Sequence, residues 1–229
     1  MSETSTSFIT AADTTDQPCT VRLEWITPDA QHMIAKCARV SNPTNQENRT
    51  SEVKLLKYLA KHKHWSPFEM ASMCLEIKTT RAISAQIIRH RSFAFQEFSQ
   101  RFAATTEYTL PYFRIQDHKN RQNSFDTIDA EQQEQLQQKA QQVIQQCFDC
   151  YNELIGAGVA KETARMILPL CTNTTIYMTG SIRSWIHYIQ LRADVDTQKE
   201  HRDVAEQAKA ILLQQIPSLS EILEATKQE

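Results

Sequence analysis

The sequence predicts an α+β fold, a predominantly helical domain with few strands. Apolar residues recur at helical spacing over most of the chain, whereas alternation of apolar and polar residues is confined to short segments near residues 21–25 and 73–78. The length of 229 residues is enough for one domain with a well-buried core. We therefore expect residues 19–229 to form a single domain, and the Ser- and Thr-rich residues 1–18 to be flexible.

The first expected element is a half-buried strand, because Val21, Leu23 and Trp25 alternate with polar neighbours. Thr27 followed by Pro28 is typical of a helix start, where proline occupies the first helical position, and predicts the first helix. The expected apolar stripe of this helix is Met33, Ile34, Cys37 and Ala38.

A second helix is expected at residues 52–61, because Leu55, Leu56 and Leu59 form a stripe. Ser66 and Glu69 then have the spacing of a capping box, although the same two side chains could also serve a ligand site. The second strand, at residues 73–78, leads into a third helix. The residues that this helix is expected to bury are Ile83, Ile87 and Ile88.

Residues 110–127 show no clear period and predict a long loop, which is either a lid or a solvated excursion. A long helix follows, and its stripe includes Cys147 and Cys150. Because both thiols fall on that stripe, we expect buried small hydrophobic residues rather than a metal or redox pair. The predicted stripe is Leu136, Ala140, Val143, Cys147, Cys150 and Leu154.

Three more helices are expected towards the C-terminus. The first begins near Lys161, stops at Pro169, and buries Ala164, Ile167 and Leu168. The second has Ser181 as its cap, ends at Arg192, and buries Ile182, Trp185, Ile186 and Ile189. The third has a capping box at Thr197 and Glu200 and ends before Pro217.

Composition excludes several classes of function. The formal net charge of -2 argues against a nucleic-acid-binding protein, which usually has a broad basic excess. No apolar run is long enough to cross a bilayer, so we expect no membrane partner. The N-terminus has no secretory signal, and the six cysteines are therefore expected to be reduced in the cytoplasm.

Glycine is nearly absent, with only Gly156, Gly158 and Gly180 in the whole chain. Neither a Gly-x-Gly-x-x-Gly turn nor a Walker loop can be formed without more glycine. A dinucleotide bound by this chain must therefore be held by side chains rather than by exposed glycine backbone.

One segment is rich in suitable side chains. Residues 89–101, RHRSFAFQEFSQR, combine arginine and histidine with hydroxyls, amides and three phenylalanines. The guanidinium group of arginine can donate hydrogen bonds to two phosphate oxygens at once, and phenylalanine offers an apolar surface against which a heterocycle can pack. This composition favours an anionic aromatic ligand, although a charged surface turn would also be compatible with it.

The spacing of Arg89, His90, Arg91 and Ser99 resembles the RHR-x7-S signature of the flavin-dependent thymidylate synthase family. Further segments of the same family occur in the same order. They are ARVS at residues 38–41, HWSPFE at 64–69, ARMILPL at 164–170 and SIRSWIHYIQLRAD at 181–194. Together they span most of the chain from residue 38 onward.

This resemblance implies a catalytic domain at residues 19–229, with helices around a small, largely antiparallel sheet. It implies the reductive methylation of dUMP to dTMP, with 5,10-methylenetetrahydrofolate as carbon donor and FAD, reduced by NADPH, as hydride carrier. It also implies a homotetramer with shared active sites. No metal is expected.

The resemblance also assigns residues. It implies FAD contacts from Ser41, Ser66, Glu69, Arg89, His90, Arg91, Glu97, Ser181, Arg183 and His187. It implies nucleotide contacts from Gln86, Glu97, Ser99, Gln100, Arg101, Arg165 and Arg192. We assign Arg192 as the catalytic residue, because a guanidinium can stabilise an ionised pyrimidine ring. Arg101 and Arg165 would bind the phosphate, with help from Ser99 and Gln86.

Two other classes of protein share some of these features. A nucleotide- or RNA-binding module could use the arginines and phenylalanines for stacking, but the chain lacks repeated basic elements. A metal hydrolase could use His62 and His64, but no complete ligand set accompanies them. Bound flavin, bound metal or neither in the absorption spectrum would separate these classes.

Overall fold

The computed structural model describes residues 19–224, so the expected flexible segment at residues 1–18 lies outside the described residues. The α+β fold class is confirmed. The strands are β1 (Thr20–Ile26), β2 (Ser72–Thr80), β3 (Ala94–Glu97), β4 (Ile115–Gln116), β5 (Ser124–Phe125) and β6 (Asn173–Ser181). The α-helices are α1 (Ala30–Ala38), α2 (Glu52–Lys61), α3 (Arg81–Ile87), α4 (Ala130–Gly156), α5 (Lys161–Ala164), α6 (Ile182–Arg192), α7 (Lys199–Gln215) and α8 (Ser220–Glu224). Short 3-10 helices are η1 (Pro43–Asn45), η2 (Ser66–Met70), η3 (Arg165–Ile167) and η4 (Pro217–Leu219).

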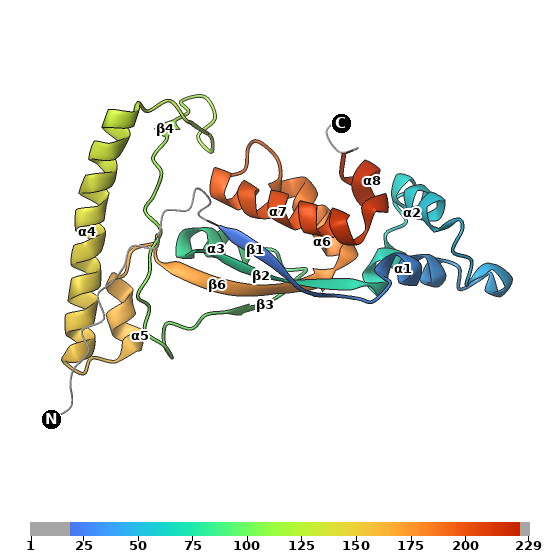
Figure 1. Cartoon of the computed structure of the whole chain (residues 1–229), viewed down its shortest axis with the longest axis horizontal. Helices are drawn as coiled ribbons and strands as arrows, with labels where there is room; N and C mark the ends of the chain where they lie inside the picture. The colour runs from blue at the N-terminus through green and yellow to red at the C-terminus, as the bar shows by residue number, and fades with distance from the viewer. Residues whose placement is uncertain (1–18, 225–229) are drawn as a thin grey trace. The chain divides into compact units, whose positions relative to one another are not determined.

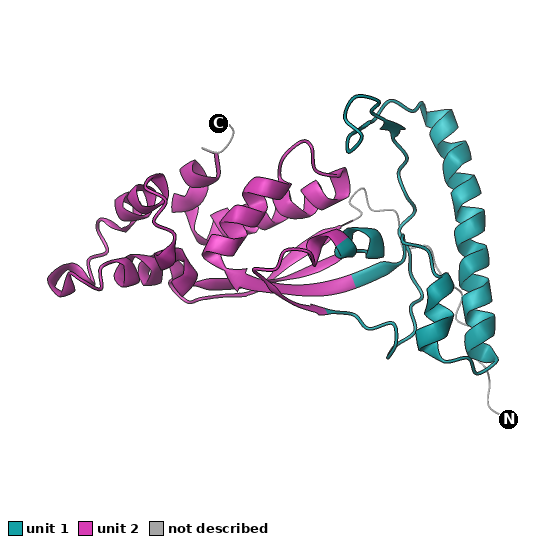
Figure 2. Ribbon diagram, turned by 180° about the vertical axis from the view of Figure 1, so that it is seen from behind, with its two compact units in different colours: residues 1–18, 79–85, 97–174 teal, residues 19–78, 86–96, 175–229 magenta. Residues whose placement is uncertain are grey.

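The chain divides into two compact units, coloured separately in Figure 2. Of the described residues, unit 1 comprises 79–85 and 97–174. Unit 2 comprises 19–78, 86–96 and 175–224. Within the described residues, no helix is both long and apolar enough to cross a membrane.

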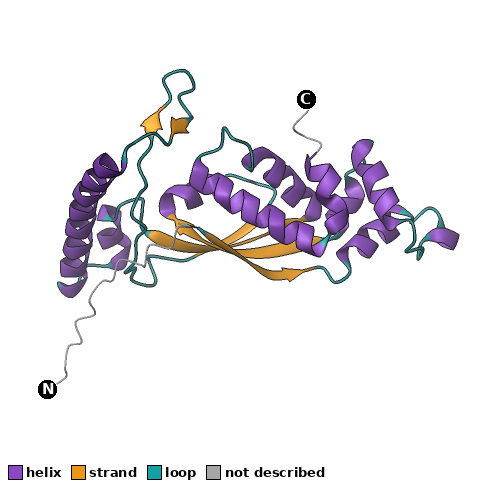
Figure 3. Cartoon of the chain, turned by 45° about the horizontal axis from the view of Figure 1, so that its top comes forward, coloured by secondary structure: helices purple, strands orange, loops and turns teal. Residues whose placement is uncertain are grey.

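Unit 2 contains most of a four-stranded sheet in the order β1-β2-β6-β3. Strands β1 and β2 are antiparallel, and Val21 pairs with Ile77. Helices α6 and α7 lie along one face of the sheet (Figures 1 and 3). The largest fully buried side chains of this unit include Trp185, Tyr188 and Phe68.

Both predicted strands are confirmed, but the predicted alternation in β1 fails at Trp25. The register shifts between Leu23 and Trp25, which is the signature of a β-bulge. Trp25, at 48% exposure, is consequently more exposed than Val21 and Leu23, with which it was expected to share a face.

The predicted start of the first helix is wrong. Thr27 belongs to the strand region instead, where its backbone N–H donates to Ser72 O (2.9 Å) and its Oγ1 accepts from Ser72 N (2.9 Å). Asp29 adopts a left-handed conformation (φ 52°) before α1 begins at Ala30. Ile34 is buried as expected, but Met33 is 36% exposed.

The predicted bounds of α2 are confirmed, and α6 begins with Ser181 as its cap, as expected. The Ser181 Oγ accepts from Ser184 N (3.2 Å). The four residues expected to be buried by α6 are all buried: Ile182, Trp185, Ile186 and Ile189.

Two predicted capping boxes are wrong. Ser66 makes no capping hydrogen bond, because residues 66–70 form the 3-10 helix η2 with Trp65 at its cap position. Gln198, not Thr197, precedes α7, and the Thr197 hydroxyl donates to Leu191 O (3.4 Å). The expected end of α7 before Pro217 is confirmed, but it is followed by the short helix α8.

Unit 1 is built on α4, which packs through Ile144 and Phe148 against Tyr108. The predicted stripe of this helix is therefore rotated, since Val143 is 59% exposed and Cys150 is also exposed. The prediction that Cys150 is a buried small hydrophobic residue is therefore wrong, and Cys147 is only partly buried. The expected loop at residues 110–127 contains the short antiparallel pair β4 and β5.

Two isoleucines expected to be buried are exposed, because their helices end early. Helix α3 ends at Ile87, so Ile88 points outward. The helix from Lys161 tightens at Arg165 into η3, which leaves Ile167 exposed while Ala164 remains buried. The short strand β3 lies within residues 89–101, where no strand was predicted.

Gly180 in β6 is required by close packing. An added Cβ would lie 2.5 Å from Cδ1 of Phe93, whose ring is buried edge-on against Trp185 with 4.8 Å between the ring centroids. Phe93 follows Arg91 by two residues, so this contact anchors the 89–101 segment to the sheet of unit 2.

We expect Gly180→Ala to destabilise the protein by about 1–3 kcal/mol, because the aromatic ring cannot move without displacing its buried neighbours. Chemical denaturation measures the effect. The matched control is Gly156→Ala, where nothing lies within 4 Å of the added Cβ, so no loss is expected. Equal stability of both variants would contradict a packing requirement at Gly180.

Candidate functional site

The arginine-rich motif begins where α3 ends. The His90 N–H donates to Ile87 O (3.1 Å) and the Phe93 N–H donates to His90 O (3.2 Å), so the chain turns sharply before β3. Cations are favourable at such a helix C-terminus, because its last carbonyls carry partial negative charge. Arg89 and Arg91 are exposed on this turn, and neither guanidinium forms a hydrogen bond or ion pair with a residue in the described range 19–224.

His90 and Arg192 are brought together from different elements of unit 2. Arg192 Nε donates to His90 Nε2 (2.9 Å) at the C-terminal end of α6. Burial, together with the smaller effects of the nearby Arg192 and His187, lowers the pKa of His90 to about 4. The imidazole is therefore neutral near pH 7, carries its proton on Nδ1 and accepts from Arg192 through Nε2.

This single bond orients the guanidinium. It uses only the Nε–H of Arg192, and the two terminal nitrogens have no hydrogen-bond partner among the described residues. Arg192 is only partly buried, so these nitrogens are available to oxygen atoms of a ligand.

A series of hydrogen-bonded polar side chains lies near His90 and Arg192. Gln86 Nε2 donates to Gln198 Oε1 (2.7 Å), and Gln86 Oε1 lies 3.3 Å from Nδ1 of His201. His201 Nε2 lies 3.1 Å from the hydroxyl of Tyr188, and both side chains are fully buried. Burial, with Arg192 and His90 nearby, lowers the pKa of His201 to about 3.

Tyr188, Gln198 and His201 were missed by the sequence analysis. A signal for His201 was present, because it precedes Val204, Ala205 and Ala208 at helical spacing and thus falls on the buried face of α7. A histidine on a buried face must satisfy its ring nitrogens internally, which makes a polar network predictable there.

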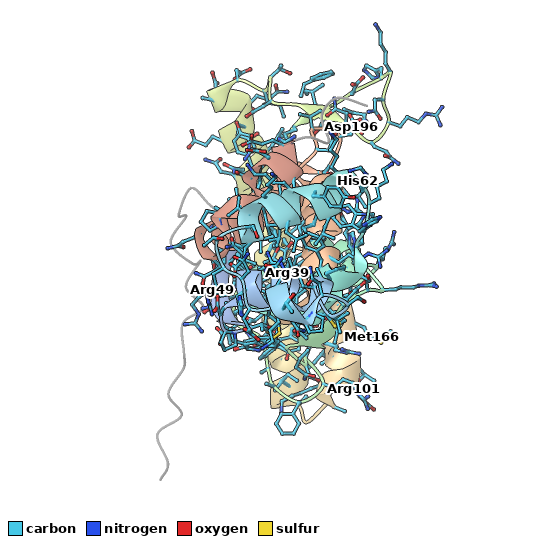
Figure 4. The ribbon with its side chains drawn as sticks, turned by 90° about the vertical axis from the view of Figure 1, so that its right-hand side faces the viewer. Arg39, Arg49, His62, Arg101, Met166 and Asp196 are labelled. Atoms are coloured by element: carbon cyan, nitrogen blue, oxygen red, sulfur yellow. The ribbon has the colours of Figure 1, made fainter. Side chains whose placement is uncertain are left out.

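The expected FAD residues Glu69 and Arg183 meet in unit 2. Arg183 Nη1 donates to Glu69 Oε1 (3.0 Å), and both side chains are partly exposed. Ser41, Ser66 and His187 are exposed on the same unit. Figure 4 views unit 2 from the end formed by α1 and α2, where Arg39 and Arg49 are labelled.

The remaining predicted residues belong to unit 1. Glu97 accepts from three donors there: Arg81 Nη1 (2.9 Å), Thr174 Oγ1 (3.1 Å) and the hydroxyl of Ser84. These three donors hold the carboxylate of Glu97 in one orientation.

Arg101 and Arg165 both contact Glu162. Arg101 Nη2 pairs with Glu162 Oε2 (3.1 Å), and Arg165 Nε donates to Glu162 O (3.4 Å). Ser99, two residues before Arg101, is exposed, whereas Gln100 is buried and its Nε2 has no partner among the described residues. A buried amide without a partner is costly and is satisfied when a ligand supplies an acceptor.

Metal-binding clusters are not found among the described residues, where no three His, Cys, Asp or Glu side chains gather. His62 and His64 instead contact the ring of Tyr58, at centroid distances of 4.3 and 6.3 Å.

Comparisons with known proteins agree with this chemistry. Residues 22–218 match the family described as thymidylate synthase complementing protein. A probable flavin-dependent thymidylate synthase of Paramecium bursaria Chlorella virus 1 is 52% identical over 85% of this chain and 91% of that protein. The flavin-dependent thymidylate synthase of a Synechocystis strain is 50% identical over 84% of this chain and 88% of its own length.

A solved structure is also similar. It is a UMP/dUMP methylase from Streptomyces cacaoi bound with 5-Br dUMP. Its TM-score is 0.82 at 26% identity, and the match covers 91% of this chain and 96% of the methylase chain.

The partly buried His90 and the fully buried His201 predict a loss of stability at mildly acidic pH. Their folded pKa values, about 4 for His90 and about 3 for His201, lie below the ordinary 6.5. The unfolded chain binds these protons first, so the free energy of unfolding falls as the pH drops below about 6.5. Denaturation between about pH 7 and about pH 5, above most carboxyl pKa values, measures the slope. A slope in His90→Gln as steep as in the wild type would contradict the assignment to His90.

Proposed function

The chain belongs to the thymidylate synthase complementing protein family, and we propose that it is an FAD-dependent thymidylate synthase that methylates dUMP to dTMP. 5,10-Methylenetetrahydrofolate donates the carbon, and FAD reduced by NADPH, when bound, supplies the hydride. The observation that carries this proposal is the neutral His90 that orients Arg192 and leaves its terminal nitrogens available.

The residues of unit 2 fit a dinucleotide. The phosphates of FAD need cationic or N–H donors, and the exposed Arg89 and Arg91 have no internal partners in the described part of the chain. Arg183 and Glu69 form a partly exposed pair, and Ser41, Ser66, Ser181 and His187 supply further polar groups. This set replaces the glycine-rich turn that the sequence lacks. We propose these residues, with His90 and Glu97, as the FAD contacts.

We propose that the nucleotide phosphate binds Arg101 and Arg165, with Ser99 and Gln86. Arg101 pairs with the carboxylate of Glu162 and Arg165 donates to the backbone carbonyl of the same residue, so Glu162 contacts both arginines in unit 1. A dianionic phosphate can compete with that single exposed carboxylate. Gln100 offers a buried N–H without a partner among the described residues, and Glu97 offers a carboxylate held by three donors.

Arg192 is the proposed catalytic residue. Methyl transfer to a pyrimidine requires electron density at carbon 5, and a guanidinium against a ring oxygen and nitrogen stabilises the ionised ring. His90 holds the Arg192 plane through Nε, so its two terminal nitrogens act as a fork. No nucleophilic thiol is assigned to this reaction.

The assembly and location are also proposals. We propose a homotetramer whose active sites are shared between subunits, with residues 19–229 as the catalytic domain. Large exposed apolar side chains such as Phe102, Met166 and Leu170 support burial against another copy. We propose the cytoplasm as its location, and the six free cysteines are consistent with a reducing compartment.

The reaction is tested by tritium release from dUMP labelled at carbon 5. We expect release that depends on NADPH and FAD and dTMP formation that depends on methylenetetrahydrofolate. A parallel reaction with labelled UMP decides between the two nucleotides. Absence of release from dUMP by flavin-loaded protein would exclude the proposed function.

Arg192→Ala should retain FAD and lose methylation, because the removed group acts on the pyrimidine and not on the cofactor. We expect the rate to fall by about 100-fold or more, the effect of removing one preorganised electrostatic donor. Flavin absorbance of the purified variant and its dTMP production measure the two properties. Arg22→Ala is the control, because Arg22 is exposed and pairs with Glu24 and Glu76. Wild-type turnover of the Arg192 variant would overturn its assignment.

Arg89→Ala should weaken FAD binding by about tenfold or more, since a charge-assisted hydrogen bond to phosphate is lost. Fluorescence titration of apoprotein with FAD measures the affinity. Arg22→Ala again serves as the control. Unchanged FAD affinity of the Arg89 variant would remove Arg89 from the proposed site.

A further inference from the structure

A directional chain of hydrogen bonds leads to Gln86. Glu200 Oε2 accepts from Gln198 Nε2 (2.9 Å), and an ionised carboxylate can only accept. The amide of Gln198 must therefore turn its oxygen towards Gln86, whose Nε2 donates to it (2.7 Å). The orientation of the Gln86 amide therefore follows from the negative charge of Glu200, the first residue of this hydrogen-bond series.

The same logic fixes the tautomer of His201. The carbonyl oxygen of Gln86 faces Nδ1 of His201 at 3.3 Å and can only accept, so Nδ1 must carry the proton. His201 Nε2 is then bare and accepts from the hydroxyl of Tyr188 at 3.1 Å. The fully buried Tyr188 keeps its proton, because burial raises the pKa of its hydroxyl. Each group from Tyr188 to Gln198 thus donates to the next, and Glu200 accepts the last bond.

This order determines what Gln86 can offer to a ligand. Its carbonyl is bound by His201 and one amide N–H is bound by Gln198. The second N–H has no partner among the residues that the structure describes, and Gln86 is only partly buried. A flipped amide would break both bonds and would present its oxygen where the N–H now lies, which an anion would oppose.

We propose that Tyr188 and His201 are positioning residues. They hold the side-chain amide of Gln86 in the orientation in which its N–H donates a hydrogen bond to the phosphate of the nucleotide. The inference rests on the proposed function, because it takes the phosphate of dUMP as the anion. His201 does not touch the nucleotide and acts only through Gln86.

The first test compares binding of dUMP with binding of FAD. In His201→Leu the donor to Gln86 is lost, so dUMP affinity of the FAD-loaded protein should fall about tenfold or more, as for a lost bond to a charged group. FAD affinity should stay within about twofold, because Gln86 is assigned to the nucleotide. His201→Asn, whose amide N–H can replace Nδ1–H, should recover most of the dUMP affinity.

The matched control is Tyr151→Phe. It removes another buried tyrosine hydroxyl, one with no partner among the described residues, and should leave dUMP binding unchanged. Tyr188→Phe should instead weaken dUMP binding, because His201 then loses the donor that selects its tautomer. Unchanged dUMP affinity in His201→Leu, or an equal loss of dUMP and FAD affinity, would overturn the positioning role.

The second test needs no ligand and no variant. Long-range proton–nitrogen NMR correlation of the full chain, labelled with ¹⁵N-histidine, should show His201 with a protonated Nδ1 and a bare Nε2. The opposite tautomer would overturn the proposal even if the His201 variants fail to fold. Wild-type protein that binds no dUMP would overturn the proposed function itself. If His201→Leu retained the wild-type affinity for dUMP, only the positioning role of Tyr188 and His201 would be overturned.

Discussion

The site depends on keeping an imidazole uncharged beside a guanidinium. His90 accepts from Arg192 Nε at 2.9 Å in its neutral form, and burial, together with Arg192 and His187, favours that form by lowering its pKa to about 4. A protonated His90 could not accept this bond and would repel Arg192. The bond joins the turn after α3 to the end of α6, two segments far apart in sequence. Desolvation thus sets both the position and the chemistry of the proposed catalytic arginine.

The scarcity of glycine explains why side chains, rather than exposed backbone, supply the contacts of the proposed site. A backbone that cannot approach a phosphate closely must use long cationic side chains, and these must be oriented by neighbours. The arginines differ in the partner that orients them. Arg192 is oriented by His90 and Arg101 by Glu162. In unit 1, Arg81 forms an ion pair with Glu97. Arg89 and Arg91, in contrast, stay exposed without a partner in residues 19–224.

Polar networks of this kind were only partly predictable. The motif at residues 89–101, the strand at 73–78 and helices α2 and α6 follow from spacing, because period and composition are local properties. His201, Gln198 and Tyr188 carry no motif, and their importance appears only when α7 and α6 are packed together. The same limit applies to Trp25, whose exposure follows from a bulge between two paired strands.

The sequence by itself determined the family, the element types and the residues with suitable chemistry, since these depend on residue identity and spacing. Tertiary structure alone decided which of those residues meet. The misplaced capping boxes at Ser66 and Thr197 show the reason. A polar side chain near a helix start has several partners within reach, and Glu69 pairs with Arg183, 114 positions away in the chain. Local propensity is worth a few tenths to about 1 kcal/mol, which packing and distant charges readily exceed.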